Sequence, residues 1–122
     1  MAKILIVEDE EMLASMYKER FEREGFEVAE ASSVDEAVRK AKEEKPNIIL
    51  LDILLKDSTG ISFLRQKNQI PEIASIPVLA FSNYDDPATK KQAFELGALE
   101  YLIKTNYTPQ QVVDHVKNHL AR

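Results

Sequence analysis

The sequence predicts an α/β fold, a doubly wound (βα)5 sandwich in which helices cover both faces of a five-stranded parallel sheet. Two continuous apolar runs, Ile4–Val7 and Ile48–Leu51, are typical of strands buried on both faces, which lie in the middle of parallel sheets. Helical patterns follow the expected strands, and right-handed crossovers distribute such helices over both faces. The second run leads directly into Asp52, which we expect at the sheet's carboxyl edge, where open α/β sheets place their sites.

The first strand, Ile4–Val7, lies between Lys3 and a run of acidic residues. The helix that follows ends at Gly25, which suits the left-handed position after a helix. Its apolar face comprises Leu13, Met16, Tyr17 and Phe21. Residues Phe26–Ala31 alternate between apolar and polar, which indicates a second, less buried strand.

The second helix opens with a capping box, because Ser33 and Glu36 have the spacing at which two side chains cap a first turn reciprocally. Its inner face comprises Val34, Ala37, Val38 and Ala41. Lys45–Pro46 ends this helix, since a residue before proline disfavours helical backbone. The third strand, which ends at Asp52, follows.

A polar loop, residues 56–60, precedes a short helix over residues 61–69, and Pro71 ends that helix. The buried side of the helix comprises Ile61 and Leu64. Residues Ile76–Phe81 form the fourth expected strand, in which Pro77 is tolerable only because it lies near the start.

Asp86–Pro87 favours the start of the fourth helix, which ends at Gly97. The apolar residues of this helix are Ala93, Phe94 and Leu96. Tyr101–Ile103 is the fifth strand. Thr108–Gln111 is a second capping box, with proline at the first helical position. The last helix presents Val112, Val113, Val116 and Leu120.

Composition is that of one globular domain, which we expect to span residues 1–122 without an effector domain. The chain is 44% hydrophobic and 30% charged, and its 122 residues can bury an ordinary core. There is no cysteine, which excludes disulfides and thiolate metal sites. The net charge of −5 argues against direct nucleic-acid binding. Neither a signal peptide nor a membrane span is indicated, so we expect a cytoplasmic protein without membrane insertion.

Chemically distinctive side chains follow four of the five expected strands. They are Glu8 and Asp9, Asp52, Ser82, and Lys104. Because these strand ends meet at one edge, we expect the side chains to converge. Three carboxylates form an all-oxygen set that suits Mg²⁺, and a carboxylate can attack a phosphoryl group to form an aspartyl phosphate. Lys104 would neutralise phosphoryl oxygens, and the Ser82 hydroxyl could donate a hydrogen bond to one of them.

Each of these residues also has an ordinary structural explanation when taken alone. The acids after the first strand could complement a helix dipole, and Asp52 could form a turn. Ser82 could be a loop residue and Lys104 a solvated lysine. The combination, with each group at a different strand end, favours a site.

In this order and spacing, the residues resemble the receiver domain of two-component response regulators. The resemblance extends from Lys3 to Leu120. It includes the acidic pair, Asp52, Ser82, Lys104, Gly60 and the run Gly97–Lys104. It implies the flavodoxin-like strand order 2-1-3-4-5. It also implies a phosphoacceptor that assists its own phosphorylation and dephosphorylation rather than an enzyme acting on other substrates.

The resemblance assigns a role to each site residue. Asp52 accepts a phosphoryl group from a sensor histidine kinase, a phosphotransfer protein or a small donor such as acetyl phosphate. Asp9 binds Mg²⁺ directly, Glu8 acts through water, and the Leu54 backbone carbonyl supplies a further ligand.

The resemblance also predicts a switch and an output surface. Ser82 is the hydroxyl of the switch, and Tyr101 is its aromatic residue, although an aromatic in a strand is also common for packing alone. The output surface, to which a downstream protein would bind, is the fourth helix, fifth strand and fifth helix.

The sequence departs from the family pattern at three positions near the site. Lys56 and Thr105 stand where proline is frequent, and Asn83 stands where a small residue is common. We hypothesise that bulky Leu54 and Tyr84 hinder the hydrolytic water and prolong the phosphorylated state. The residues after Lys104 lack the arginine-rich pattern of the transcription-factor subfamily, so its dimer contacts are not expected.

The sequence also bears on other classes of function. The departures leave open a phosphorylation-independent, receiver-like binding module. A nucleotide- or flavin-binding enzyme is disfavoured, because glycine occurs only at positions 25, 60 and 97, which excludes a dinucleotide fingerprint and a P-loop. His115 and His119 lie one helical turn apart, but the sequence offers neither a zincin glutamate nor a third nearby ligand, and the helix dipole explains histidines near a carboxyl end.

Overall fold

The computed structural model describes residues 2–56 and 58–120, and it has the predicted α/β architecture. Asp57, in the expected polar loop, lies outside the described residues. The elements in chain order are β1 (Lys3–Val7), α1 (Glu11–Arg23), β2 (Glu27–Ala31), α2 (Val34–Glu44), β3 (Ile48–Asp52), α3 (Gly60–Asn68), β4 (Val78–Ser82), α4 (Pro87–Glu95), β5 (Glu100–Ile103), the 3₁₀ helix η1 (Lys104–Asn106) and α5 (Pro109–Leu120).

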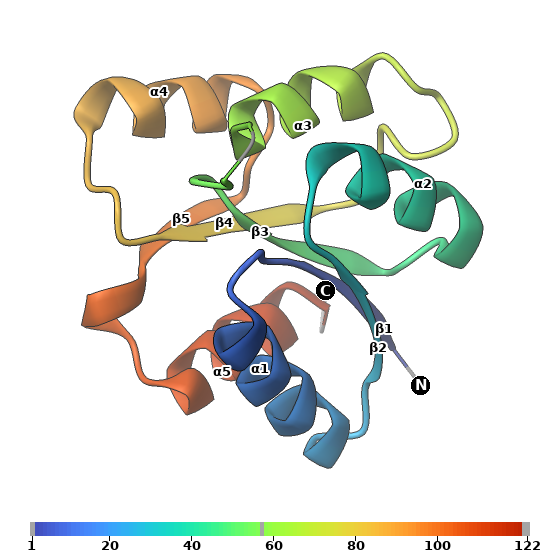
Figure 1. Ribbon diagram of the computed structural model, residues 1–122, viewed down its shortest axis with the longest axis vertical. Coiled ribbons are helices and arrows are strands. Elements are labelled where there is room, and N and C mark those ends of the chain that lie inside the picture. Colours follow the sequence, from blue (N-terminus) through green and yellow to red (C-terminus); the bar gives the residue numbers. More distant parts are fainter. Residues whose placement is uncertain (1, 57, 121–122) are drawn as a thin grey trace.

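The five strands form one parallel sheet in the order β2-β1-β3-β4-β5, as the resemblance implied. Helices α1 and α5 cover one face, and α2, α3 and α4 cover the other (Figure 1). Every residue of β3 and β4 is buried, because these strands are covered on both faces. The central position of β3 fixes where its last residue, Asp52, can lie.

Both predicted capping boxes are present, in different forms. The Thr108 hydroxyl accepts from Gln111 N at 3.1 Å, and the Gln111 side chain accepts from Thr108 N at 2.8 Å, which is fully reciprocal. The Ser33 hydroxyl accepts from Glu36 N, but Glu36 Oε1 accepts from Ser32 N rather than from Ser33.

Several expected details were wrong. The fourth strand begins at Val78 rather than at Ile76, because Pro77 has no N–H to donate to the ladder. It ends at Ser82, which therefore belongs to the strand rather than to the following loop. Met16 and Phe94 are 37% and 50% exposed, so the buried faces of α1 and α4 are narrower than the apolar pattern indicated.

Gly60 packs the start of α3 directly against the end of β3. A Cβ atom at this position would lie 2.7 Å from the backbone oxygen of Asp52 and 2.9 Å from Ile53 Cα. Only glycine permits this approach without a backbone shift, so Gly60 helps to set the position of Asp52. None of the helices in the described part of the chain combines the length and apolar composition needed to cross a membrane.

Candidate functional site

Asp52 lies at the carboxyl end of the central strand and is only 4% exposed. Its Oδ1 accepts a hydrogen bond from Leu54 N at 3.2 Å, and its Oδ2 accepts from Lys104 Nζ at the same distance. The buried strand and these two donors hold the carboxylate in one place at the edge of the sheet.

Glu8 and Asp9 join Asp52 in one cluster at the ends of β1 and β3. One carboxylate oxygen from each residue lies within 4.8 Å of the others. Glu8 is 3% exposed, whereas Asp9 is only partly buried and lies nearer to solvent. Three carboxylate oxygens at this spacing fit a hard, oxygen-preferring cation of the Mg²⁺ class.

Lys104 spans two of the three carboxylates. Its Nζ lies 2.7 Å from Glu8 Oε1 and 3.2 Å from Asp52 Oδ2, and its side chain is 12% exposed. The ammonium group also lies 4.7 Å from the centroid of the Phe81 ring, which favours the cation through the ring's electron-rich face. The lysine therefore enters the site over an apolar wall and carries the cluster's neutralising charge.

The environment of Asp52 disfavours its ionised form. Burial raises the pKa of Asp52 to about 7, the positive charge of Lys104 opposes that rise, and the negative charge of Glu8 adds to it. When no metal ion is bound, the single positive charge of Lys104 does not compensate for the two buried carboxylates of Glu8 and Asp52. This imbalance is what a bound divalent ion would relieve.

Ser82 and Tyr101 are connected through the backbone of Tyr84. The fully buried Ser82 hydroxyl accepts from Tyr84 N at 3.0 Å, and the Tyr101 hydroxyl donates to Tyr84 O at 2.7 Å. Burial raises the pKa of the Tyr101 hydroxyl above its usual value. The sequence did not reveal this link, because a backbone group common to all residues carries it.

The loop after β3 also contacts the acidic cluster. The N–H of Lys56 donates to Asp9 Oδ2, a bond that proline at this position could not make. Leu54 forms an isolated antiparallel bridge with Thr59, and the residue is 48% exposed. Within the described residues, no backbone N–H donates to the Leu54 carbonyl.

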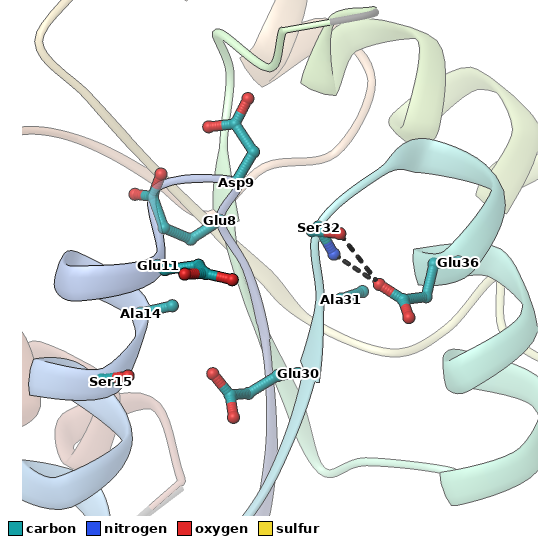
Figure 2. Close-up of a pocket in the computed structure, with 9 residues that line it drawn as sticks. All are labelled: Glu8, Asp9, Glu11, Ala14, Ser15, Glu30, Ala31, Ser32 and Glu36. Carbon is teal, nitrogen blue, oxygen red and sulfur yellow. Dashed lines mark hydrogen bonds between the residues drawn. The ribbon is translucent and has the colours of Figure 1, made fainter.

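An acidic hollow of about 370 Å³ opens beside the cluster, between α1 and the turn from β2 into α2 (Figure 2). Its acidic lining residues are Glu8, Asp9, Glu11, Glu30 and Glu36. Figure 2 shows Glu8 and Asp9 at one end of this hollow and Glu30 at the other. The concentration of negative charge favours the approach of cations to the cluster.

Residues 4–117 match the family model of the response regulator receiver domain. The chain is 37% identical over 120 residues to the alkaline phosphatase synthesis transcriptional regulatory protein PhoP of Bacillus subtilis. It is 34% identical to the transcriptional regulatory protein ResD of the same organism. These alignments cover 98% of this chain and 49% and 48% of the relatives, so the chain spans about half their length.

Solved structures agree with this family. A response regulator receiver domain protein (CheY-like) from Methanospirillum hungatei superposes with a TM-score of 0.90 at 26% identity, over 99% of this chain and 94% of that one. A two-component response regulator of the LuxR family from Aurantimonas gives 0.88 at 30% identity, over 99% and 86%. On the family match, the sequence relatives and the shared strand order, this chain belongs to the response regulator receiver domains of two-component systems.

Proposed function

We propose that this receiver domain accepts a phosphoryl group on Asp52 from a histidine kinase or a phosphotransfer protein. The main support is the position of Lys104, whose ammonium group reaches both Glu8 and Asp52 at the end of the central strand. A buried carboxylate with a cationic neighbour and an adjoining acidic cluster is suited to phosphoryl transfer, which depends chiefly on positioning and charge neutralisation.

In the proposed transfer, an Asp52 carboxylate oxygen forms a bond to phosphorus while the bond from phosphorus to the donor imidazole nitrogen breaks. Lys104 stabilises the negative charge of the phosphoryl oxygens. Hydrolysis reverses the modification, because water attacks phosphorus and releases inorganic phosphate and the free carboxylate. The protein thus promotes both the gain of the phosphoryl group from the donor and its loss to water.

The residues that would hold Mg²⁺ are Glu8, Asp9 and Asp52, together with the Leu54 carbonyl. Bound Mg²⁺ would supply positive charge to the carboxylates and to the transferred phosphoryl oxygens. The spacing of the carboxylate oxygens within 4.8 Å supports this assignment. Asp9 and Glu8 would hold the ion at the cluster, which leaves one Asp52 oxygen for the attack.

The same proposal assigns Ser82, Tyr84 and Tyr101 to signal output. Movement of the Ser82 hydroxyl toward a phosphoryl group breaks the hydrogen bond that it accepts from Tyr84 N. The Tyr84 backbone is then free to shift, which releases its carbonyl from the hydrogen bond donated by the Tyr101 hydroxyl. The element that changes is therefore the β4–α4 connection, which borders the proposed output face formed by α4, β5 and α5. Exposed Phe94 and Leu99 give this face the apolar surface that a downstream protein would cover.

Labelling with acetyl phosphate or a phosphorylated kinase tests the proposal. The wild-type protein should gain one acid-stable, base-labile phosphoryl group per chain, and EDTA should abolish the labelling. Asp52→Asn should remove it, whereas Asp85→Asn, a matched change at a surface aspartate paired with Lys90, should not. Undiminished labelling of Asp52→Asn would refute the proposal. Mg²⁺ binding without labelling would favour the phosphorylation-independent binding module instead.

A further inference from the structure

Phe81 lies between Lys104 and Asp52 at the carboxyl edge of the sheet. Asp52 and Phe81 are register partners at the ends of β3 and β4, so their side chains point to the same face of the sheet. Lys104 follows β5, which lies on the other side of β4 from β3. To reach Asp52, the lysine therefore crosses the whole width of β4, because two strand spacings of about 10 Å separate β5 from β3.

The Phe81 ring lies beneath this crossing. Lys104 Nζ is 4.7 Å from the ring centroid, and the lysine side chain is only 12% exposed. At this distance the electron-rich face of a ring attracts an ammonium group, most strongly where little water remains. The hydrogen bonds of the ammonium group go to the carboxylates of Glu8 and Asp52. The ring thus gives the ammonium group a third contact, of a different kind.

The ring itself is held in place from the side of α1. Phe81 is fully buried, and Tyr17 packs against it edge to face, at a centroid distance of 5.4 Å and an interplanar angle of 87°. Tyr17 is also buried, and this arrangement is one that aromatic pairs prefer. Because the ring cannot move freely, it offers the ammonium group of Lys104 a fixed point of contact.

Phe81 differs from the other contacts of Lys104 because it carries no charge. Glu8 and Asp52 are proposed ligands of Mg²⁺, so a bound ion would compete with Lys104 for their oxygens. A phenyl ring has no oxygen to offer the ion. Its contact with the ammonium group can therefore persist while the carboxylates exchange one cation for another.

We propose that Phe81 is a positioning residue, which holds the ammonium group of Lys104 over the end of β3, where the oxygens of a transferred phosphoryl group would lie. This inference rests on the proposed phosphoryl transfer, and Phe81 acts in it through Lys104. An aliphatic side chain of similar volume would fill the core at this position but would not attract the ammonium group. The electrons of the ring are required, and not only its bulk.

Fluorinated phenylalanines in place of Phe81 test this role with little change in the shape of the core. Fluorine withdraws electron density from the ring face, so mono-, di- and trifluorinated rings weaken the attraction stepwise. We expect labelling by acetyl phosphate to slow with each fluorine, by about 5- to 30-fold for the trifluorinated ring. The same series at Phe21, which is fully buried and stacks edge to face with Phe26, is the matched control and should leave the rate unchanged.

The motion of the Lys104 ammonium group gives a second readout, which requires no phosphoryl transfer. Nitrogen relaxation NMR of the metal-free, unphosphorylated protein measures the order parameter of this group. The trifluorinated ring at position 81 should lower that order parameter, whereas the same ring at position 21 should not. Added Mg²⁺ should enlarge the difference between the wild type and the position 81 variant, because the ion withdraws Glu8 from the lysine.

The two readouts separate this role of Phe81 from the proposed function. An ammonium group that responds to fluorination at position 81, in a protein that accepts no phosphoryl group, would support the positioning of Lys104 and refute only the transfer. Wild-type labelling that does not slow along the series at position 81 would overturn the role of Phe81 and leave the transfer intact. Equal losses at positions 21 and 81 would assign the effect to core packing, which also overturns the proposal.

Discussion

Lys104 lies closer to Glu8 than to the proposed acceptor. Its Nζ is 2.7 Å from Glu8 Oε1 and 3.2 Å from Asp52 Oδ2. Glu8 therefore competes with Asp52 for the ammonium group of Lys104. The negative charge of Glu8 also disfavours ionisation of Asp52. The pKa of Asp52 therefore depends on how closely Lys104 pairs with each of the two carboxylates.

Removing the charge of Glu8 should lower the pKa of Asp52. In Glu8→Gln the repulsion ends and Lys104 is free to pair with Asp52, so both changes favour the ionised carboxylate. The titration of the Asp52 side-chain carbon, followed by NMR in EDTA, measures this shift directly. Glu11→Gln, an acid in the same hollow but outside the Lys104 contacts, is the control. An unchanged or higher Asp52 pKa in Glu8→Gln would contradict the competition inferred from the distances.

The raised pKa of Asp52 predicts how stability depends on pH when no metal is bound. The native protein holds this proton more tightly than the unfolded chain, because burial raises the pKa from 3.8 to about 7. Stability should therefore fall as the pH rises through this interval. Asp52→Asn should gain about 1–3 kcal/mol at about pH 8, a rise in Tm of about 4 °C per kcal/mol.

Thermal unfolding of the wild type and Asp52→Asn in EDTA, across the pH range, measures that gain. The difference should shrink toward about pH 4, where the native carboxyl is protonated. Asp85→Asn should show no comparable gain, since Asp85 is exposed. A stability difference between Asp52→Asn and the wild type that does not change with pH would show that the carboxylate charge is not its cause.

Lys56 should influence metal affinity through its backbone rather than through its side chain. Its N–H donates to Asp9 Oδ2, and Lys56→Pro removes this donor. Freeing that oxygen should tighten Mg²⁺ binding by about 2- to 10-fold, the scale of one hydrogen bond. Lys56→Ala keeps the N–H and separates the effect of the side-chain charge. Equal Mg²⁺ affinities of the two variants in calorimetry would show that the backbone bond has no influence.

Leu54 and Tyr84 should control the lifetime of the phosphorylated state. The two residues are 48% and 44% exposed, and their backbone N–H groups donate to the side chains of Asp52 and Ser82. Leu54→Ala and Tyr84→Ala should each accelerate release of inorganic phosphate, because a smaller side chain admits the hydrolytic water more readily. The rate is measured after removal of the donor. Met12→Ala, a change at a residue of α1 that is 85% exposed, is the control. Unaltered release rates would exclude this shielding.

The fold was predictable because its strongest signals are local. The apolar run before Asp52 identified a central strand, and the capping residues Ser33 and Thr108 marked helix starts that the structure confirms. The convergence of Glu8, Asp52 and Lys104 followed from the position of parallel strand ends along one edge. Strand β4 begins two residues later than the apolar pattern predicted, because Pro77 has no N–H to donate to the sheet.

The remaining features depend on contacts that sequence spacing does not encode. The backbone of Tyr84 links Ser82 with Tyr101, and any residue type could make the same two bonds. Glu100 meets His115 and His119 only because α5 packs beside β5. How closely Lys104 approaches each of the two carboxylates likewise depends on side-chain packing. The order of the residues in the sequence does not determine it.

Identifying the phosphorylated residue chemically tests the central claim most directly. The protein is incubated with acetyl phosphate and Mg²⁺, reduced with borohydride, which converts an aspartyl phosphate to homoserine, and mapped by peptide mass spectrometry. We predict homoserine at Asp52 and at no other acidic residue, with none in EDTA. Homoserine at Asp9 or 5-hydroxynorvaline at Glu8, instead of homoserine at Asp52, or no conversion despite bound Mg²⁺, would contradict the account.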